Sequence, residues 1–346
     1  MTNTLKTRAI ELNSQQSLIE SEWNIPERQT GEITINVISA GLNPVDYKFR
    51  NGSIPIQLPA VLGHECLGEI IDSDNHDDIG RRVLAYLPGP HTQSSGAWCD
   101  TLHVSRLFTT IIPDTAPVEY AAYPLCGLTA MRCFRRIQHQ GIKHCFVAGV
   151  SGGVGWLFTQ LCIHHGITVY TTVRSEASHH KIQSAFNDSI HCMVATNATS
   201  SDAIQQHFQR DHFDACADFV GGQQKLLALS LCGFNGHFIT IVEEQSGCVD
   251  LLDARESPAF QKSLCVHFEF LGAQAYFGTP TDQKTYQDEL QQLIPLLDNQ
   301  TLHYPNIKIL QGLHAETVQT GLDQLEQRTD PNVNKIIVTN TNETSS

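Results

Sequence analysis

The stretch VAGVSGGVG, residues 147–155, places four glycines within seven positions, after an apolar run and before a helical pattern. Glycine permits a tight turn and removes side chains where a pyrophosphate must approach backbone N–H groups. The positive end of the following helix then faces the anion. The spacing is G-x-x-G-G-x-G, which differs from the dinucleotide pattern G-x-G-x-x-G. The stretch predicts a phosphate-binding turn, and a glycine-rich turn without a ligand is the alternative.

Apolar runs and helical patterns alternate around this turn. We expect strands in HCFVAGV (144–150), ITVYTTV (167–173), IHCMVA (190–195), FDACADFV (213–220), HFITIV (237–242) and CVHFEFLGA (265–273). We expect helices at 153–165, 178–187, 201–209 and 222–232. Strands that alternate with helices predict right-handed crossovers and a parallel sheet covered on both faces. The region from about residue 127 is therefore predicted to be an α/β domain with a doubly wound parallel sheet.

The remaining regions have a different pattern. Up to about residue 125, short β-like runs are broken by Gly, Pro, Asn and Asp, which indicates a compact, barrel-like all-β unit. After about residue 273 come a helix, a short strand, a second helix and a last strand, NKIIVT (334–339). Because 346 residues exceed the usual size of a single core, we expect two domains.

Composition excludes several classes of function. The net charge is -14 and no Lys/Arg run is present, which argues against a nucleic-acid partner. The eleven cysteines are scattered singly, without a C-x-x-C pair, as expected for reduced thiols in the cytosol. No apolar run approaches the roughly 18 residues that cross a bilayer, and the N-terminus lacks an apolar signal region. We expect a cytoplasmic protein with small-molecule ligands and no membrane partner.

The second expected strand ends in YTTVRSEASHHKIQ, residues 170–183. Sites for NAD place an acidic residue here, about 20 residues past the glycines, on the adenosine ribose. Arg174 and Ser175 stand at this place, and Lys181 follows. Cationic and hydroxyl groups bind a 2′-phosphate, which a carboxylate would repel. The residues favour NADPH, although a shift of two residues would put Glu176 at the ribose and favour NADH.

The order of segments resembles the medium-chain dehydrogenase/reductase superfamily and, within it, the zinc-independent quinone oxidoreductase group. The resemblance is carried by AGLNPVDYKFRNG (40–52), PAVLGHECLGEI (59–70), AAYPLCGLTAMRCF (121–134), the glycine turn, DFVGG (218–222) and GHFITI (236–241). It implies a GroES-like β-barrel catalytic domain, residues 1–126 and 273–346, around a Rossmann domain, residues 127–272. It also implies an active site in the cleft between the domains and a homodimer formed largely by the last Rossmann strand, about residues 265–271.

The resemblance, together with the rule that ligands bind at the carboxyl ends of parallel strands, predicts the cofactor site. Thr129 matches a family position at the nicotinamide-side phosphate or ribose. Gly221 would let the fourth strand end against the cofactor, and Thr240 and Val242 would border its nicotinamide half. The predicted cofactor-binding residues are Thr129, Gly149, Ser151, Gly152, Gly153, Val154, Gly155, Arg174, Ser175, Lys181, Gly221, Thr240 and Val242.

Alcohol-oxidising members of the superfamily hold a catalytic zinc with a first Cys, the His and Glu of a G-H-E motif and a second Cys near the domain junction. This chain keeps His64 and Glu65, but Asn43 stands at the first Cys position, and a neutral amide is a poor zinc ligand. Cys126 lies close to the second Cys position. We expect no metal, with a zinc alcohol dehydrogenase that uses His64, Glu65 and Cys126 as the alternative.

Without a metal to polarise an alcohol, hydride donation to an electrophilic acceptor is the easier reaction. Quinones and α,β-unsaturated carbonyls fit, because the developing charge moves to an oxygen that needs only a hydrogen-bond donor. By resemblance, Asn43 and Tyr47 line the cleft near the nicotinamide, and both are neutral donors. We expect an NADPH-dependent reductase of quinones or enones. A cofactor-binding protein with a structural or regulatory role and no turnover is a further alternative.

Two positions near these residues have other expected roles. Asp46 is expected to cap the short helix after Asn43 rather than to act as a base. The family commonly reads Gly-Lys before its last strand, whereas this chain has Asn334 and Lys335. This departure leaves a cofactor role for Lys335 open.

Overall fold

The structure is a computed structural model that describes residues 4–89, 96–196, 198–243, 255, 257–330 and 332–340. The chain forms two compact units. Unit 1 consists of Met1–Leu128, Leu271–Asp298 and Asn306–Ser346, and unit 2 consists of Thr129–Phe270 and Asn299–Pro305. The boundaries expected after residues 126 and 272 lie close to these. The segment 299–305 joins unit 2 because the Trp156 indole donates to the carbonyl of His303 (3.0 Å) and the Tyr304 hydroxyl donates to that of Gly153 (3.1 Å).

Unit 2 is built on a six-stranded sheet in the order β11-β10-β9-β12-β13-β14, and every neighbouring pair is parallel. Its strands are β9 (His144–Ala148), β10 (Thr168–Val173), β11 (Ile190–Val194), β12 (Phe213–Asp218), β13 (Cys232–Thr240) and β14 (Cys265–Phe268). Counted from β9, this is the strand order 3-2-1-4-5-6 of dinucleotide-binding sheets. The expected doubly wound sheet is confirmed.

The helices of unit 2 follow the strands in the expected alternation. They are α3 (Gly153–His164), α4 (Glu176–Phe186), the short helix η4 (Asn187–Ser189), α5 (Ser201–Phe208), α6 (Gln223–Leu231) and α7 (Pro258–Gln261). Ser175 and Ser200 cap α4 and α5, since their side chains accept backbone N–H groups of the first turn. Ile204 of α5 and Leu229 of α6 are buried in one apolar cluster with Phe146 of β9. Local capping and apolar spacing thus agree with the sheet.

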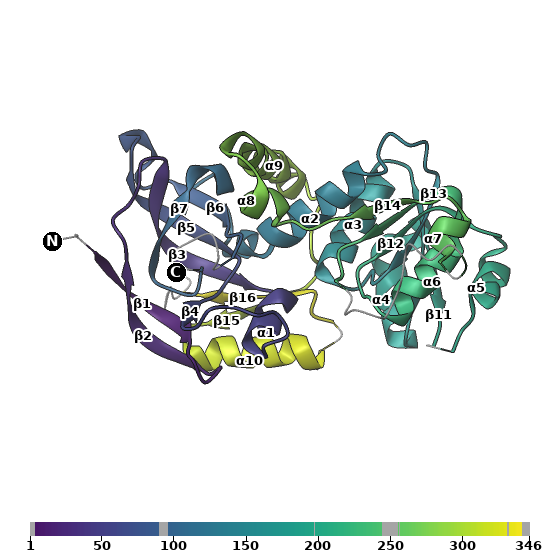
Figure 1. Cartoon of the computed structure of the whole chain (residues 1–346), viewed down its shortest axis with the longest axis horizontal. Helices are drawn as coiled ribbons and strands as arrows, with labels where there is room; N and C mark the ends of the chain where they lie inside the picture. Colours follow the sequence, from purple (N-terminus) through teal and green to yellow (C-terminus); the bar gives the residue numbers. More distant parts are fainter. Residues whose placement is uncertain are drawn as a thin grey trace. The chain divides into compact units, whose positions relative to one another are not determined.

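Unit 1 contains a seven-stranded sheet in the order β15-β16-β3-β5-β6-β8, with β7 also paired to β3, and a three-stranded sheet β2-β1-β4. The expected GroES-like β unit is confirmed. Its strands are β1 (Leu5–Leu12), β2 (Leu18–Ile25), β3 (Glu32–Leu42), β4 (Ala60–Val61), β5 (Glu65–Ser73), β6 (Arg82–Tyr86), β7 (Thr101–Ser105), β8 (Thr109–Ile111), β15 (Ile307–Gln311) and β16 (Lys335–Thr339). Figure 1 shows the yellow C-terminal strands among the purple and blue N-terminal ones, because β16 pairs antiparallel with β3.

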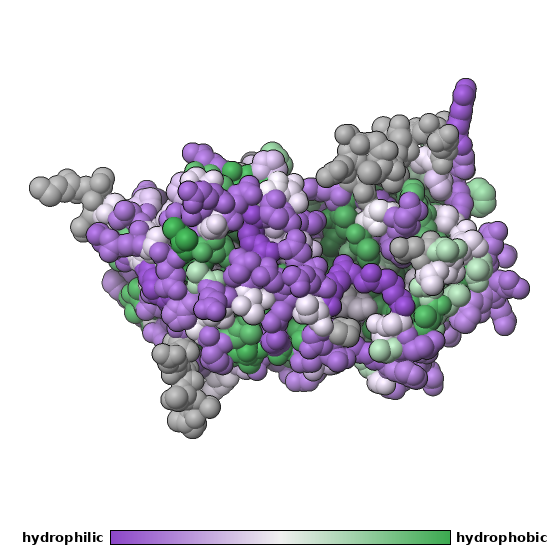
Figure 2. All heavy atoms as spheres, turned by 90° about the horizontal axis from the view of Figure 1, so that it is seen from below, coloured by the Kyte–Doolittle hydropathy of each residue, from purple (hydrophilic) through white to green (hydrophobic). Residues whose placement is uncertain are grey.

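The helices of unit 1 are short except for two in the C-terminal part of the chain. They are α1 (Pro44–Arg50), η1 (His76–Asp78), η2 (Arg106–Phe108), η3 (Val118–Ala122), α8 (Ala273–Phe277), α9 (Pro280–Asp298) and α10 (Ala315–Gln327), while α2 (Pro124–Arg135) crosses from unit 1 into unit 2. Among the described residues, no helix has both the length and the apolar character needed to cross a membrane. Hydrophilic residues cover much of the face in Figure 2, and apolar residues reach it in separate patches.

The glycine turn allows unusually close packing between β9 and α3. Gly149 has φ +92°, a left-handed conformation, and a Cβ on it would lie 2.7 Å from a methyl group of Val220. A Cβ on Gly155 would lie only 2.2 Å from the carbonyl oxygen of Gly149. Only glycine fits at these two positions, so the helix begins directly against the end of the strand.

We expect Gly155→Ala to destabilise the chain. Alanine would gain about 1 kcal/mol of helix propensity, but its methyl group would clash with backbone atoms that have little room to move. Overpacking costs about 1–3 kcal/mol, and because the Cβ would meet backbone at 2.2 Å we expect the upper part of this range, a net loss of about 2 kcal/mol in the free energy of unfolding, measured by denaturant titration. Gly152→Ser is the matched control, because a Cβ there meets only Gly149 O at 3.4 Å. Equal stabilities of the two variants would contradict the packing account.

Candidate functional site

The turn after β9 leads into a helix start that no side chain caps. Gly152 is the N-cap of α3, and no side chain caps this helix. The N–H of Gly152 donates to Gly149 O at 3.0 Å, and that of Trp156 donates to Gly152 O at 2.9 Å. Ser151 and Gly152 are exposed. The first turn of the twelve-residue α3 therefore has the bare backbone and the helix dipole that suit a pyrophosphate.

The carboxyl ends of β12 and β13 are joined through Asp218. This buried carboxylate accepts the N–H groups of Val220 (3.0 Å) and Gly221 (2.8 Å) and the hydroxyl of Thr240 (3.0 Å). The Thr240 oxygen in turn accepts the N–H of Val242 at 3.2 Å. The predicted residues Gly221, Thr240 and Val242 thus lie together at one edge of the sheet. Sequence reasoning missed Asp218, although an acidic residue at a strand end before two glycines is a signal that could have indicated it.

A buried lysine bonds the segment that follows β13. Lys225 in the first turn of α6 donates to the carbonyl of Val242 at 2.7 Å, and its Nζ lies 4.0 Å from Asp218 Oδ2. Its side chain is almost fully buried. Lys225 was not among the predicted residues, because a single lysine in a helical pattern normally lies in solvent.

The residues expected at the 2′-phosphate differ in their surroundings. Arg174 and Ser175 follow β10 directly, and both are exposed. The Ser175 hydroxyl accepts the N–H of Ser178 at 3.2 Å as the cap of α4. The ammonium of Lys181 lies over the ring of Trp156, 5.6 Å from its centroid. Lys181 therefore contacts α3, whereas Arg174 is exposed at the end of β10.

Six buried polar side chains meet in unit 1, although they come from four separate segments of the chain. The first segment joins β3 to α1, the second begins β5, the third begins α2 and the fourth begins β16. The side chains, with exposed fractions of 0 to 4%, are those of Asn43, Asp46, His64, Glu65, Cys126 and Lys335. We call them the buried polar cluster.

The ammonium of Lys335 contacts three members of this cluster. Its Nζ lies 2.6 Å from Glu65 Oε1. It also donates to Asn43 Oδ1 and, at 3.6 Å, to the Cys126 sulfur. Burial alone would lower the pKa of the lysine, but Cys126, Glu65 and Asp46 outweigh it and raise the pKa above its ordinary value. Lys335 is therefore charged at neutral pH.

Both oxygens of the Glu65 carboxylate accept hydrogen bonds from other groups of the protein. Its Oε1 also accepts the side-chain N–H of Asn43 at 2.7 Å, and its Oε2 accepts the backbone N–H of Leu125 at 2.7 Å. Gly41 makes room for it, because a Cβ there would lie 2.2 Å from Glu65 Oε1. Glu65 thus joins β5 to the start of α2.

Asp46 holds both the helix start and the histidine. Its Oδ2 accepts the backbone N–H of Asn43 at 2.7 Å, which confirms the expected capping role. Its Oδ1 lies 2.6 Å from His64 Nδ1. The ring of Phe49 stacks on His64, with centroids 5.6 Å apart and an interplanar angle of 10°. The imidazole therefore has a fixed orientation.

This set of residues does not fit a catalytic zinc. Zinc is held by thiolate, imidazole or carboxylate groups that converge on one point. Both Glu65 oxygens already accept hydrogen bonds, and the Cys126 sulfur faces the Lys335 ammonium. In the described part of the chain, no three His, Cys, Asp or Glu side chains are arranged to hold a metal ion. The side chains of the alternative ligand set thus already contact other groups. His64 bonds Asp46, both oxygens of Glu65 accept hydrogen bonds, and the Cys126 sulfur faces the Lys335 ammonium.

Asn43 and Tyr47, the two predicted substrate donors, have different surroundings. The carboxamide of Asn43 belongs to the buried polar cluster, where it bonds Glu65 and Lys335. Tyr47 is half-buried on α1. Burial raises the pKa of its phenol above the ordinary value, while the charge of Arg328 lowers this pKa and that of Glu326 raises it. Tyr47 therefore stays protonated at neutral pH and keeps an O–H donor.

Thr129, one of the predicted cofactor-binding residues, is buried in α2.

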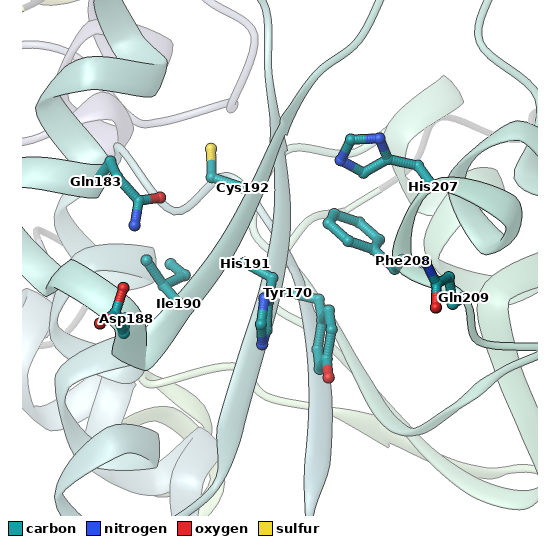
Figure 3. Close-up of a pocket in the computed structure, with 9 residues that line it drawn as sticks. All are labelled: Tyr170, Gln183, Asp188, Ile190, His191, Cys192, His207, Phe208 and Gln209. Carbon is teal, nitrogen blue, oxygen red and sulfur yellow. The ribbon is translucent and has the colours of Figure 1, made fainter.

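A pocket of about 360 Å³ lies elsewhere in unit 2, at the outer strands β10 and β11. Tyr170 and His191 are opposite each other in register, and their rings stack with centroids 4.6 Å apart. Figure 3 shows these rings beside Phe208 and His207 of α5. No predicted cofactor residue lines this pocket, and it lies toward the amino ends of the strands rather than at their carboxyl ends, where ligands of such sheets bind.

Comparison with known proteins gives three kinds of match. Residues 29–109 match the alcohol dehydrogenase GroES-like domain. The Mus musculus synaptic vesicle membrane protein VAT-1 homolog-like is 30% identical over 223 residues, which cover 62% of this chain and 51% of that protein. A mitochondrial NAD(P)H oxidoreductase of Dictyostelium discoideum is 24% identical over 324 residues, which cover 81% of this chain and 87% of that protein. The chain spans about half the length of the first of these relatives.

Solved structures share the fold over almost the whole chain. A quinone oxidoreductase of Pseudomonas syringae superposes with a TM-score of 0.79 at 20% identity, covering 96% of this chain and 99% of that chain. At this level of identity the match concerns the fold.

Proposed function

We propose that this chain, whose resemblance to the medium-chain dehydrogenase/reductase superfamily is confirmed, transfers hydride from NADPH to a quinone or an α,β-unsaturated carbonyl without a catalytic metal. The observation that carries the proposal is the glycine turn that opens the uncapped α3 at the carboxyl edge of a 3-2-1-4-5-6 sheet. The buried polar cluster of unit 1, in which Lys335 pairs with Glu65, supports the proposal that the reaction needs no catalytic metal.

The residues at the sheet edge suit a nicotinamide dinucleotide. A bound reduced dinucleotide supplies the hydride, and the protein supplies binding and orientation. The N–H groups in the first turn of α3, which begins at Gly153 and has no side-chain cap, would hold the pyrophosphate. Gly221, Thr240 and Val242, which Asp218 and its hydrogen bonds hold together, would border the nicotinamide half. The Dictyostelium relative is named an NAD(P)H oxidoreductase, which supports this class of cofactor.

The proposed acceptor takes one hydride and one proton. A quinone then becomes a hydroquinone, an enone becomes a saturated carbonyl, and the dinucleotide is oxidised. The acceptor oxygen needs a donor that is protonated at neutral pH, and Tyr47, with its raised phenol pKa, suits this role. We assign Asn43 a positioning role instead, because its carboxamide bonds Glu65 and Lys335.

We also propose that a second copy of the chain covers strand β14. This strand is at the edge of the sheet, and exposed apolar side chains lie at its end and just after it, with Phe268 66% and Phe270 49% exposed. An uncovered apolar edge strand favours pairing with another strand. Light scattering should give twice the 38.3 kDa of one chain, and Phe268→Lys should halve this mass. Phe260→Lys, on α7, is the matched control, and a monomeric parent protein would refute the dimer.

Acceptor-dependent oxidation of NADPH tests the proposed activity. Quinones or enones should accelerate the oxidation, alcohols with NADP⁺ should not react, and dialysis against a strong chelator should leave the rate unchanged. Tyr47→Phe should lower kcat about 100-fold or more, as for loss of a proton donor, whereas Tyr120→Phe should not. Loss of rate after chelation would refute metal-free catalysis. Cofactor binding without turnover would indicate a structural or regulatory protein.

The choice of dinucleotide depends on Arg174. A hydrogen bond to a charged group contributes about 1.5–3 kcal/mol, or about 10- to 100-fold in affinity. Arg174→Ala should therefore raise KM for NADPH by about this factor and leave KM for NADH unchanged. Glu176→Gln is the comparison, because this change should raise KM for NADH only if the Glu176 carboxylate binds the ribose. Equal effects of Arg174→Ala on both dinucleotides would show that the guanidinium does not bind the extra phosphate.

A further inference from the structure

We propose that the ammonium of Lys335 is a built-in cation that takes the place of a divalent metal in the buried polar cluster and keeps metal ions out of it. The inference concerns unit 1 alone and goes beyond the proposed function. It does not depend on which dinucleotide or acceptor the protein uses.

The contacts of the ammonium match its bonding capacity. A lysine ammonium has three N–H donors and no acceptor. The cluster offers three acceptors to it, a Glu65 oxygen at 2.6 Å, the Asn43 carboxamide oxygen and the Cys126 sulfur at 3.6 Å. A zinc ion would need its sulfur ligand at about 2.3 Å and its oxygen ligands at about 2.0–2.2 Å. The cluster is therefore arranged around a hydrogen-bonding cation, at longer distances than a metal requires.

The charges of the cluster require a cation. Glu65 is fully buried, and a buried carboxylate without a partner is strongly unfavourable. Asp46 is also fully buried, and its oxygens bond the Asn43 backbone and His64. The Lys335 ammonium supplies the positive charge next to Glu65 that a bound metal would otherwise bring. A metal ion could enter only if this ammonium left or lost its proton.

Asn43 also helps to keep metal ions out of the buried polar cluster. A Cys there would offer a thiolate, so that the ligand types near the cluster would become two Cys and one His, the set found in alcohol dehydrogenase. Asn43 offers an amide oxygen, which suits an ammonium better than a zinc ion. Lys335 and Asn43 therefore act as a pair, and replacing only one of them should not open the site.

Cobalt(II) binding tests this pair without any assay of activity. The Co²⁺ content after gel filtration and the visible thiolate–Co²⁺ absorbance are measured for the parent chain, Asn43→Cys, Lys335→Met and Asn43→Cys/Lys335→Met. The double variant should bind one Co²⁺ per chain, at least tenfold more tightly than either single variant, and the parent chain should retain none. Cys126→Ser or His64→Ala, added to the double variant, should weaken Co²⁺ binding at least tenfold.

One further variant guards against loss of folding, and another is a matched control. If Lys335→Met leaves Glu65 unpaired and the chain does not fold, Asn43→Cys/Lys335→Met/Glu65→Gln removes both charges of the ion pair and carries the same expectation. Asn43→Cys/Lys225→Met is the matched control, because Lys225 is equally buried but lies in unit 2. It should bind Co²⁺ no better than Asn43→Cys alone, and Co²⁺ should raise Tm only for the chains that bind it.

Three results would overturn the inference. The first is equal Co²⁺ affinity of Asn43→Cys and the double variant, which would show that the ammonium does not exclude metals. The second is stoichiometric metal in the parent chain that is lost with Cys126→Ser. The third is a folded double or triple variant that binds no Co²⁺. A lack of NADPH oxidation would not bear on metal exclusion by Lys335. A lack of Co²⁺ binding would likewise not bear on hydride transfer, which the NADPH assay tests.

Discussion

The ion pair between Lys335 and Glu65 is the contact on which unit 1 depends. It joins the start of β16 to the start of β5, and through Leu125 and Asn43 it also joins the starts of α2 and α1. Breaking a buried pair by removing one partner costs about 3–5 kcal/mol, because the other charge stays buried. That is a large share of the about 5–15 kcal/mol by which domains are stable. These four segments therefore depend on one another for their positions.

In unit 2 the corresponding constraint is steric. The carbonyl of Gly149 lies where a Cβ of Gly155 would be, so α3 can begin against β9 only with glycine at this position. The same closeness leaves the first N–H groups of α3 without a side-chain cap. Asp218 then holds the ends of β12 and β13 beside this turn in the sheet. A surface suited to a phosphate thus results from the tight packing of the turn.

Much of unit 2 could be predicted from local patterns. The glycine spacing at 147–155, the apolar runs and the helical stripes each depend on neighbours in the sequence, and the parallel sheet follows from their alternation. The contacts of Lys181 and Lys225 could not be predicted in this way. The first lies over Trp156 and the second bonds Val242, and both contacts depend on how helices pack on the sheet. The likeness of Asn43 to a family position likewise did not show that its carboxamide bonds Lys335.

The sequence by itself determined the class of fold, the place of the glycine turn and the lack of a cysteine at position 43, because these depend on residue type and short spacing. Only the tertiary structure decided the role of Lys335. Residues 43, 65, 126 and 335 are far apart in the chain, and their meeting depends on the pairing of β16 with β3 and of β3 with β5. Burial then makes a single lysine charge decisive, since a buried carboxylate needs a cation and the protein itself supplies one.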